Sequence, residues 1–269
     1  MKQQIQHYRD QGYFIADDAI TSDMVIALKV ALERCEQKIR CGDVIDDPER
    51  IRVNGKSVHS FSHIRALLAP EFEEPVFAQY IASEPILRYV RLILGDQLRL
   101  GWVSAFVVDN EPYQVGWHRD IGKEERDGSY DVEMEILSRV RKNTLKWHVA
   151  LIDDPCLWLV PGSHRRYRTA EEREFLVGGA IGELSTGKQI VLKKGQTLFW
   201  VGNTNHRGVM PHRTNRRLTL TAALARYRHG DPVEELDERY RWMLAYNVRA
   251  SFTQKGQGFY DNWRLAVGA

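Results

Sequence analysis

Residues 197–228, TLFWVGNTNHRGVMPHRTNRRLTLTAALARYR, contain two runs rich in strand-forming residues, separated by a polar stretch with turn signals. Four similar runs precede them, at 98–109, 145–153, 157–160 and 188–193. The chain has no glycine-rich nucleotide-binding loop and no regular alternation of strands with helices. Short strands in succession therefore predict an antiparallel barrel or sandwich rather than a parallel sheet.

The region before these strands is predicted to be mainly helical. A first helix is expected between a cap at Thr21 or Ser22 and a stop at Gly42, because the apolar residues between them recur at helical spacing. A second helix is expected over 75–94. The polar stretch 43–62 between the two is expected to be a loop.

Two further segments complete the predicted organisation. Residues 121–144 interrupt the strands, and their second half has acidic residues first and basic residues last, as a short helix prefers. A final helical segment is expected over 233–248. We thus predict one domain, with helical support at 1–97, a strand core at 98–228 and a C-terminal helical segment at 229–269.

Composition limits the class of protein. The 269 residues carry 38 Lys and Arg against 36 Asp and Glu, whereas a broad nucleic-acid footprint usually needs a larger basic excess. The three cysteines form no CxxC pair, no signal segment is evident, and no apolar run is long enough to span a membrane. We therefore expect a cytoplasmic protein that acts on a small molecule, without nucleic-acid or membrane partners; the sequence does not predict its oligomeric state.

The segment GWHRD (116–120) places His118 and Asp120 two residues apart. In an extended segment such residues project to the same side, so that an imidazole and a carboxylate converge on one point. With a second histidine they would form the 2-His-1-carboxylate triad that suits non-haem Fe(II). The motif is weak alone, because a second match, His229-Gly230-Asp231, is expected to be a turn.

A second histidine is available further along the chain. His206 lies 88 residues after His118, and Arg217 follows His206 by 11 residues. An arginine on a neighbouring strand is well suited to neutralise the distal carboxylate of a metal-bound 2-oxo acid. His212 is an alternative ligand, but the residue eleven positions beyond it is Ala223.

With these features the chain resembles the phytanoyl-CoA dioxygenase family of Fe(II)- and 2-oxoglutarate-dependent oxygenases. The resemblance covers the opening segment YRDQGYFIADDAITSDMV (8–25), the WHRD motif, the strand containing Trp147, the PGSH turn (161–164) and the stretch from His206 to Arg217. It implies a mainly β protein with α-helices: a double-stranded β-helix, or cupin-like jelly roll, with N-terminal and C-terminal helices packed outside.

The resemblance also implies cofactors and residue roles. The implied cofactors are Fe(II), 2-oxoglutarate and O2, and the implied reaction is hydroxylation or a related oxidation of an unactivated C–H bond, with release of succinate and CO2. The implied metal ligands and catalytic residues are His118, Asp120 and His206, and the implied co-substrate contacts are Arg217, Thr219 and Trp147. Gly208 departs from family members that have a serine two residues after the distal histidine, which removes one expected hydrogen bond to the co-substrate.

The substrate is not named by any motif. Arg119 and Arg207, each beside a candidate ligand, would suit a polar or anionic small molecule. Residues 121–144 are a candidate lid, because they follow two of the ligands directly.

The other histidines have more ordinary interpretations. His148 is expected to point away from the cavity if Trp147 points into it, since neighbours on a strand alternate. His164 is expected to stabilise a turn, and His59 and His63 are candidates for the cavity mouth.

Two other classes of function remain open on the sequence alone. One is a jelly-roll metalloenzyme that holds Zn(II) or another metal on the same three ligands for hydrolysis or isomerisation, because Zn(II) also accepts these donors. The other is a non-catalytic, cupin-like binding protein.

Overall fold

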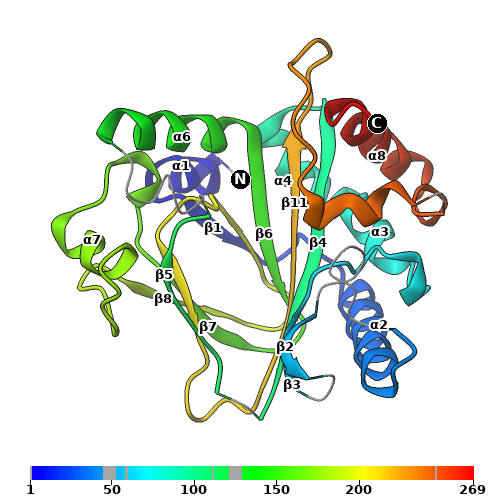
Figure 1. The fold of residues 1–269 in the computed structure, drawn as a ribbon, viewed down its shortest axis with the longest axis horizontal. Helices are drawn as coiled ribbons and strands as arrows, with labels where there is room; N and C mark the ends of the chain where they lie inside the picture. Colours follow the sequence, from blue (N-terminus) through cyan, green and yellow to red (C-terminus); the bar gives the residue numbers. More distant parts are fainter. Residues whose placement is uncertain (1, 45–52, 58–59, 111, 121–128, 246) are drawn as a thin grey trace.

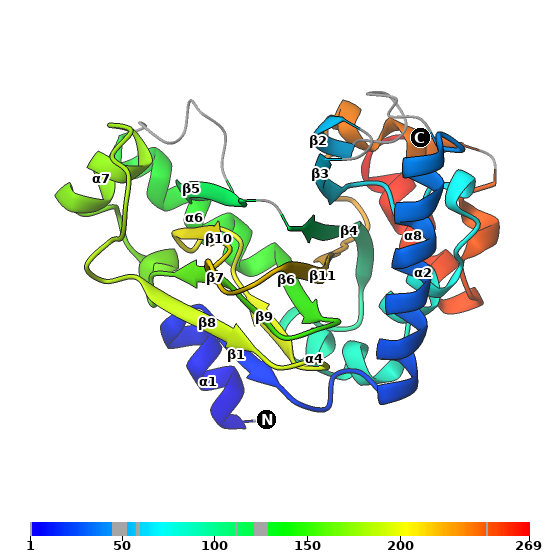
Figure 2. The same ribbon diagram turned by 90° about the horizontal axis from the view of Figure 1, so that it is seen from below.

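In the computed structural model the chain folds into two sheets that face each other (Figures 1 and 2). The structure describes residues 2–44, 53–57, 60–110, 112–120, 129–245 and 247–269. In spatial order the seven-stranded sheet contains β1 (Tyr13–Ala16), β9 (Thr197–Trp200), β6 (Thr144–Ala150), β11 (Arg216–Arg226), β4 (Leu98–Asp109), β3 (Ser60–Ile64) and β2 (Val53–Ser57). The four-stranded sheet contains β5 (Gln114–His118), β10 (His206–Val209), β7 (Asp154–Leu159) and β8 (Lys188–Leu192). All these pairings are antiparallel, and the predicted jelly roll is confirmed.

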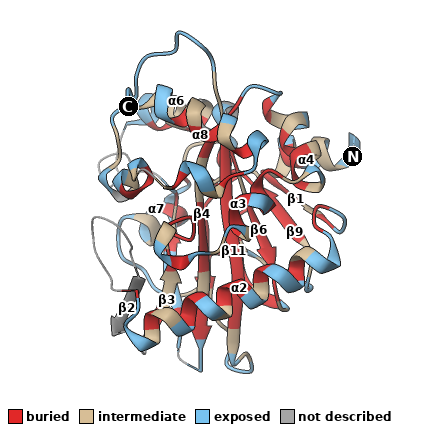
Figure 3. Cartoon of the chain, turned by 90° about the vertical axis from the view of Figure 1, so that its right-hand side faces the viewer, coloured by how far each residue is buried: buried red, intermediate tan, exposed pale blue. Residues whose placement is uncertain are grey.

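Helices cover the outer face of the seven-stranded sheet (Figure 3). They are α2 (Ser22–Cys41), α3 (Val76–Ile81), α4 (Glu84–Leu94) and α8 (Gln254–Ala266), with α1 (Lys2–Gln11) beside β1. Two more helices, α6 (Tyr130–Asn143) and α7 (Ala170–Leu176), lie toward the four-stranded sheet. Short 3-10 segments occupy Pro70–Phe72, Ser163–Arg165, Glu238–Leu244 and Arg249–Ser251. The largest cluster of buried apolar side chains contains residues of this sheet and of the helices that cover it, so one face of that sheet is committed to the core.

The helix α2 forms where local signals agree. The Thr21 side chain accepts a hydrogen bond from the Met24 amide at 3.3 Å, and Gly42 ends the helix with a left-handed φ of 80°. Its buried face includes Leu28 and Leu32, which lie one helical turn apart. The predicted cap and stop are both confirmed.

Three predicted elements differ from the structure. The stretch 43–62, expected to be a loop, contains β2 and the start of β3, as well as residues outside the described ranges. The helix expected over 75–94 is two helices, because Pro85 at the start of α4 favours a new helix N-terminus. Among its described residues, the segment 233–248 contains the 3-10 segment Glu238–Leu244 and no α-helix, and α8 begins at Gln254.

The fold brings together segments far apart in the chain. Strands β5 and β10 are neighbours in the four-stranded sheet, and their register pairs His118 with His206. Strand β11 lies between β6 and β4 in the opposite sheet. The space between the two sheets is therefore bordered by the segments that carry every predicted ligand. Within the described ranges, each helix is either too short or too polar to cross a membrane.

Candidate active site

The three predicted metal ligands converge at one end of the space between the sheets. One potential ligand atom from each of His118, Asp120 and His206 lies within 4.8 Å of the other two. The distances from Asp120 Oδ1 are 3.8 Å to His118 Nε2 and 3.7 Å to His206 Nε2. The fold thus brings His118 and Asp120 next to His206, which lies 88 positions after His118 in the chain.

Each ligand is held by a partner behind it. The Nδ1 atoms of His118 and His206 lie 2.8 Å from the carbonyl oxygens of Gly116 and Thr204. Because a carbonyl only accepts, Nδ1 is the protonated nitrogen in each ring, and each Nε2 atom is on the side of the ring that faces Asp120. Lys146 Nζ donates to Asp120 Oδ2 at 2.8 Å, which leaves Oδ1 directed at the two histidines.

The electrostatics keep the ligands in the forms that bind a metal. Burial alone would raise the pKa of Asp120, but Lys146 and the two histidines hold it well below its usual value, so the side chain is a carboxylate. Burial lowers the pKa of His206 well below its ordinary value, so its ring is neutral. Two imidazoles and one carboxylate on one side of a cavity are the donor set of a non-haem Fe(II) centre.

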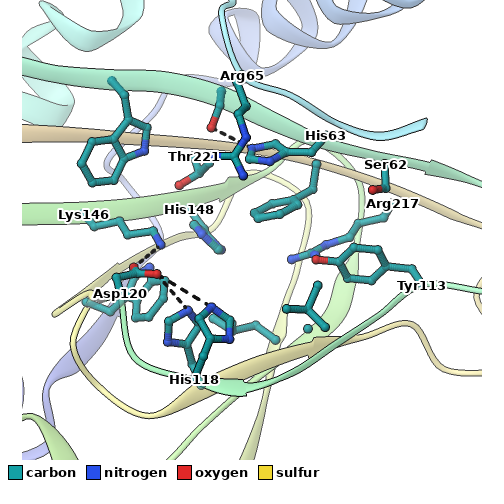
Figure 4. Close-up of a pocket in the computed structure, with 18 of the residues that line it drawn as sticks. Ser62, His63, Arg65, Tyr113, His118, Asp120, Lys146, His148, Arg217 and Thr221 are labelled. Carbon is teal, nitrogen blue, oxygen red and sulfur yellow. Dashed lines mark hydrogen bonds and ion pairs between the residues drawn. The ribbon is translucent and has the colours of Figure 1, made fainter. Parts of the chain in front are cut away.

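The cavity beside the triad has a volume of about 770 Å³. Figure 4 shows His118 and Asp120 on one side of it and Arg65 and His63 on the opposite side, with His148 and Arg217 between them. The residues that line the cavity also include Ser62, Trp102, Phe106, Tyr113, Lys146, Asp237 and Tyr240. The cavity therefore joins the metal ligands to the predicted co-substrate arginine in one space.

Arg217 is almost completely buried and carries its charge into this cavity. Its guanidinium carbon lies 4.4 Å from the ring centre of Phe106 and 5.2 Å from that of Tyr113. Behind it, Nε donates to Asp154 Oδ2 at 3.2 Å. Burial would raise the pKa of Asp154, but the charge of Arg217 and the hydrogen bonds from Thr219 and the Cys156 amide together lower that pKa, so both groups are ionised. A fixed, buried guanidinium facing a cavity is a carboxylate site.

Thr219 has a different role from the one expected. Its hydroxyl donates to the same Asp154 oxygen, and the residue does not line the cavity. Asp154 Oδ2 accepts from both Thr219 and Arg217 Nε, so Thr219 supports the arginine through Asp154.

The expected orientation of Trp147 is wrong. Its indole is fully buried in the core beneath the helices, where Nε1 donates to the Tyr80 hydroxyl at 3.1 Å. The alternation along β6 therefore turns His148 into the cavity, against the edges of Phe106 and Trp200. Neither ring nitrogen of His148 has a hydrogen-bond partner among the described residues. Burial lowers its pKa well below the ordinary value, so the ring is neutral.

Arg119 borders the cavity, but its guanidinium is bound by protein groups. Its side chain is 2% exposed and donates to Asn205 Oδ1 at 2.5 Å and to Glu133 Oε1 at 2.8 Å. Burial lowers its pKa to about 10, so it remains charged near neutral pH. Arg119 lies between the ligands His118 and Asp120, and Asn205 directly precedes His206. The Arg119–Asn205 hydrogen bond therefore joins the two segments that carry the ligands.

Arg207 is also held by the protein. It is buried between the rings of Trp117 and Trp158, each 5.1 Å from its guanidinium carbon, and it donates to Gly182 and Glu183. It faces away from the cavity because its neighbours in β10, His206 and Gly208, face toward it. The prediction that Arg119 and Arg207 bind substrate is therefore not supported.

Of the other histidines considered from the sequence, His63 lines the cavity, whereas His164 and His212 do not. His212 is exposed in a turn, and His164 lies 3.2 Å from the Arg9 carbonyl oxygen in the 3-10 turn at Ser163. His63 lines the cavity and lies 3.0 Å from Ser104 Oγ, whereas His59 lies outside the described residues.

The candidate lid is only partly described, since residues 121–128 lie outside the described ranges. Its second half forms α6, as predicted, and Glu133 of that helix is fully buried between Arg119 and Arg168. This half of the segment is anchored to the sheet that carries the ligands.

Sequence reasoning missed Lys146, Asp154 and Tyr113. Lys146 could have been found from His148, because the two residues share a face of β6. Nothing local marks the other two. Asp154 acts on an arginine 63 residues away, and Tyr113 lies over Gly208, 95 residues later.

Comparison with known proteins agrees with this geometry. The sequence profile of the family described as "Phytanoyl-CoA dioxygenase (PhyH)" matches residues 8–217, a stretch that includes the triad and Arg217. No curated protein gives a significant match by sequence.

Solved structures share the fold at low sequence identity. EctD from S. alaskensis, solved with 2-oxoglutarate and 5-hydroxyectoine, has a TM-score of 0.64 at 19% identity, over 84% of this chain and 76% of its own. AviO1 from Streptomyces viridochromogenes Tue57 has a TM-score of 0.60 at 17% identity, over 86% and 96% of the two chains. HygX from Streptomyces hygroscopicus, solved with nickel, 2-oxoglutarate and hygromycin B, has a TM-score of 0.56 at 19% identity, over 88% and 91%.

The family profile covers well over half of the chain, and the residues it spans include the three convergent ligands and the buried arginine. The chain therefore belongs to the phytanoyl-CoA dioxygenase family of Fe(II)- and 2-oxoglutarate-dependent oxygenases.

Proposed function

We propose that this protein hydroxylates an unactivated C–H bond of a small polar molecule, converting substrate, 2-oxoglutarate and O2 into hydroxylated product, succinate and CO2. The observation that carries the proposal is that the triad, Arg217 and His148 border one cavity. When bound together, Fe(II) and 2-oxoglutarate supply the O2 activation that removes hydrogen from the substrate.

The chain's own residues bind and orient these groups. His118, His206 and Asp120 Oδ1 would hold the metal, and Lys146 keeps Asp120 in the orientation that presents this oxygen. Arg217, fixed by Asp154, would hold the distal carboxylate of 2-oxoglutarate. A co-substrate extended between them would pass His148, whose neutral ring offers one donor and one acceptor.

The rest of the cavity lining supports a polar substrate. It includes Ser62 of β3, Arg65, Asp237 and Tyr240, so both signs of charge and several hydrogen-bonding groups are present. Trp102 adds an aromatic surface. Arg119 and Arg207 do not favour an anionic substrate, because their guanidinium groups are bound by protein groups. Two neighbours with this fold, EctD and HygX, were solved with 5-hydroxyectoine and hygromycin B, which are polar molecules.

The reaction is tested by measuring succinate formed from 2-oxoglutarate under air, with Fe(II) and ascorbate, in the presence of a panel of small polar molecules. We expect turnover that a true substrate raises and couples to a hydroxylated product. His118→Ala and Asp120→Ala should reduce succinate formation at least 100-fold, because each removes one of three ligands.

The matched control is His212→Ala, which removes an exposed histidine outside the cavity and should leave turnover unchanged. Succinate formation that survives His118→Ala and Asp120→Ala would contradict the proposal. Tight Zn(II) binding with no succinate from any member of the panel would favour the hydrolytic alternative instead.

A further inference from the structure

Gly208 and Tyr113 occupy one space at the arginine end of the cavity. A Cβ atom at Gly208 would lie 2.8 Å from Tyr113 Cε1 and 2.9 Å from the Tyr113 hydroxyl oxygen, distances that leave no room for a side chain. The backbone there is fixed, because Gly208 pairs with Val115 of β5 and with Leu157 of β7. The tyrosine ring therefore fills the position that a side chain at 208 would take.

The Tyr113 ring is held in place and faces Arg217. Its backbone carbonyl accepts a hydrogen bond from the Met210 amide at 3.0 Å, and the residue is 8% exposed while lining the cavity. Figure 4 shows the phenol oxygen directed at the Arg217 guanidinium. Phe106 lies on the guanidinium as well, so the charge is enclosed by two rings.

Arg217 has one edge committed to the protein and another available to a ligand. Asp154 accepts from its Nε, and Asp154 does not line the cavity, whereas Arg217 and Tyr113 do. The donors at this end of the cavity therefore include the outer guanidinium edge and the phenol.

We propose that the Tyr113 hydroxyl is a second donor to the distal carboxylate of 2-oxoglutarate, beside Arg217, and that Gly208 is required because it makes room for the ring. This inference rests on the proposed binding of 2-oxoglutarate. The chemistry is consistent, since burial raises the pKa of Tyr113 while Arg217 opposes that rise only in part, so the phenol keeps its proton and donates it. A hydrogen bond to a carboxylate is charge-assisted and so is among the stronger ones.

The test measures binding of 2-oxo acids to the Fe(II)-loaded protein without O2, by calorimetry. Pyruvate is the matched probe, because it presents the same 2-oxo acid group but has no distal carboxylate. Tyr113→Phe should raise the Kd for 2-oxoglutarate about tenfold, which corresponds to about 1.4 kcal/mol, and leave the Kd for pyruvate unchanged.

A rescue variant tests the role of Gly208. Gly208→Ser alone should weaken 2-oxoglutarate binding, because the new Cβ collides with the ring. With the ring removed, Tyr113→Ala/Gly208→Ser should bind 2-oxoglutarate more tightly than Tyr113→Ala, since a smaller hydroxyl then has the vacated space.

Three results would overturn the inference while leaving the function intact. They are wild-type affinity for 2-oxoglutarate in Tyr113→Phe, equal weakening of both 2-oxo acids, or no gain from the second substitution in the rescue pair. A wild-type protein that binds neither 2-oxo acid in the presence of Fe(II) would overturn the proposed function and this inference together.

Discussion

At the scale of single residues, the metal site is organised before a metal arrives. Carbonyl oxygens fix both histidine rings, and Lys146 fixes the carboxylate. Gly202 contributes by allowing a close approach, because a Cβ there would lie 2.9 Å from Asp120 Oδ2. Ligands oriented in this way lose less conformational freedom on binding a metal than free side chains do.

Lys146 is the partner whose removal tests this organisation. In Lys146→Met, Asp120 loses the contact that holds Oδ2, so we expect metal affinity to fall about 10–100-fold, measured by Co(II) titration calorimetry. Lys193→Met is the control, because its ion pair with Asp153 has a similar length, 3.0 Å, but lies on the exposed surface. Equal Co(II) affinity in the two variants would show that Lys146 does not orient Asp120.

His148 provides a pH-dependent prediction. Because burial lowers its folded-state pKa, only the unfolded chain takes up a proton at this residue as the pH falls below about 6.5. Above that pH, His148 therefore causes no change in the free energy of unfolding with pH. Below it, proton uptake at this one residue should lower the free energy of unfolding by about 1.4 kcal/mol per pH unit.

The measurement is urea unfolding of the metal-free protein from pH 7.5 to pH 5, with His148→Phe as comparison. The variant cannot take up this proton, so its stability should fall less steeply with decreasing pH. Parallel curves for the two proteins would show that His148 is not held neutral.

The residue scale also shows what local sequence can and cannot predict. His118 and Asp120 were predictable, because their spacing places both side chains on one side of a strand, whereas His206 was predictable only from its interval to Arg217 and from the family resemblance. The orientations of Trp147 and His148 were not, because both faces of β6 are buried and hydrophobic alternation is absent. Arg119 and Arg207 were misassigned because their partners, such as Glu133, come from other elements.

At the scale of elements, α6 is joined to the metal site by buried charges. Glu133 accepts from Arg119 and Arg168, all three of which are buried. Glu133→Ala leaves two buried guanidinium groups without their carboxylate, so we expect a loss of about 3–5 kcal/mol in the free energy of unfolding, measured with urea.

Glu135 of the same helix is the matched control. It is exposed, so Glu135→Ala should change stability by no more than about 0.5 kcal/mol. A Glu133→Ala protein as stable as Glu135→Ala would mean that the buried charges do not anchor the helix.

Elements differed in how well sequence predicted them. The helix α2 was found because its cap, period and stop all lie within one segment. Strand β1 was indicated only by the family resemblance of the opening segment, because its four residues become a strand by pairing with β9, more than 180 positions away. Proline at the start of α4 was the local signal that should have divided the helix expected over 75–94.

At the scale of the whole molecule, the two sheets perform different tasks. One face of the seven-stranded sheet is packed under helices, and its other face supplies Arg217, His148 and Lys146 to the cavity. The four-stranded sheet supplies His118 and His206. The jelly roll was predictable from the order of strands and the family motifs. The cavity was not, because its lining comes from segments that meet only in the folded chain.

The most direct test of the account is an anaerobic titration of the Fe(II)-loaded protein with 2-oxoglutarate, followed by the visible charge-transfer absorbance that a 2-oxo acid gives on chelating Fe(II). We predict a saturable signal with one equivalent per chain that is lost in His206→Ala. In Arg217→Lys, which keeps the charge but not the planar fork, saturation should need at least about tenfold more 2-oxoglutarate while pyruvate titrates as in the wild type. No signal in the wild-type protein, or an Arg217→Lys titration identical to it, would contradict the assignment of these residues to one site.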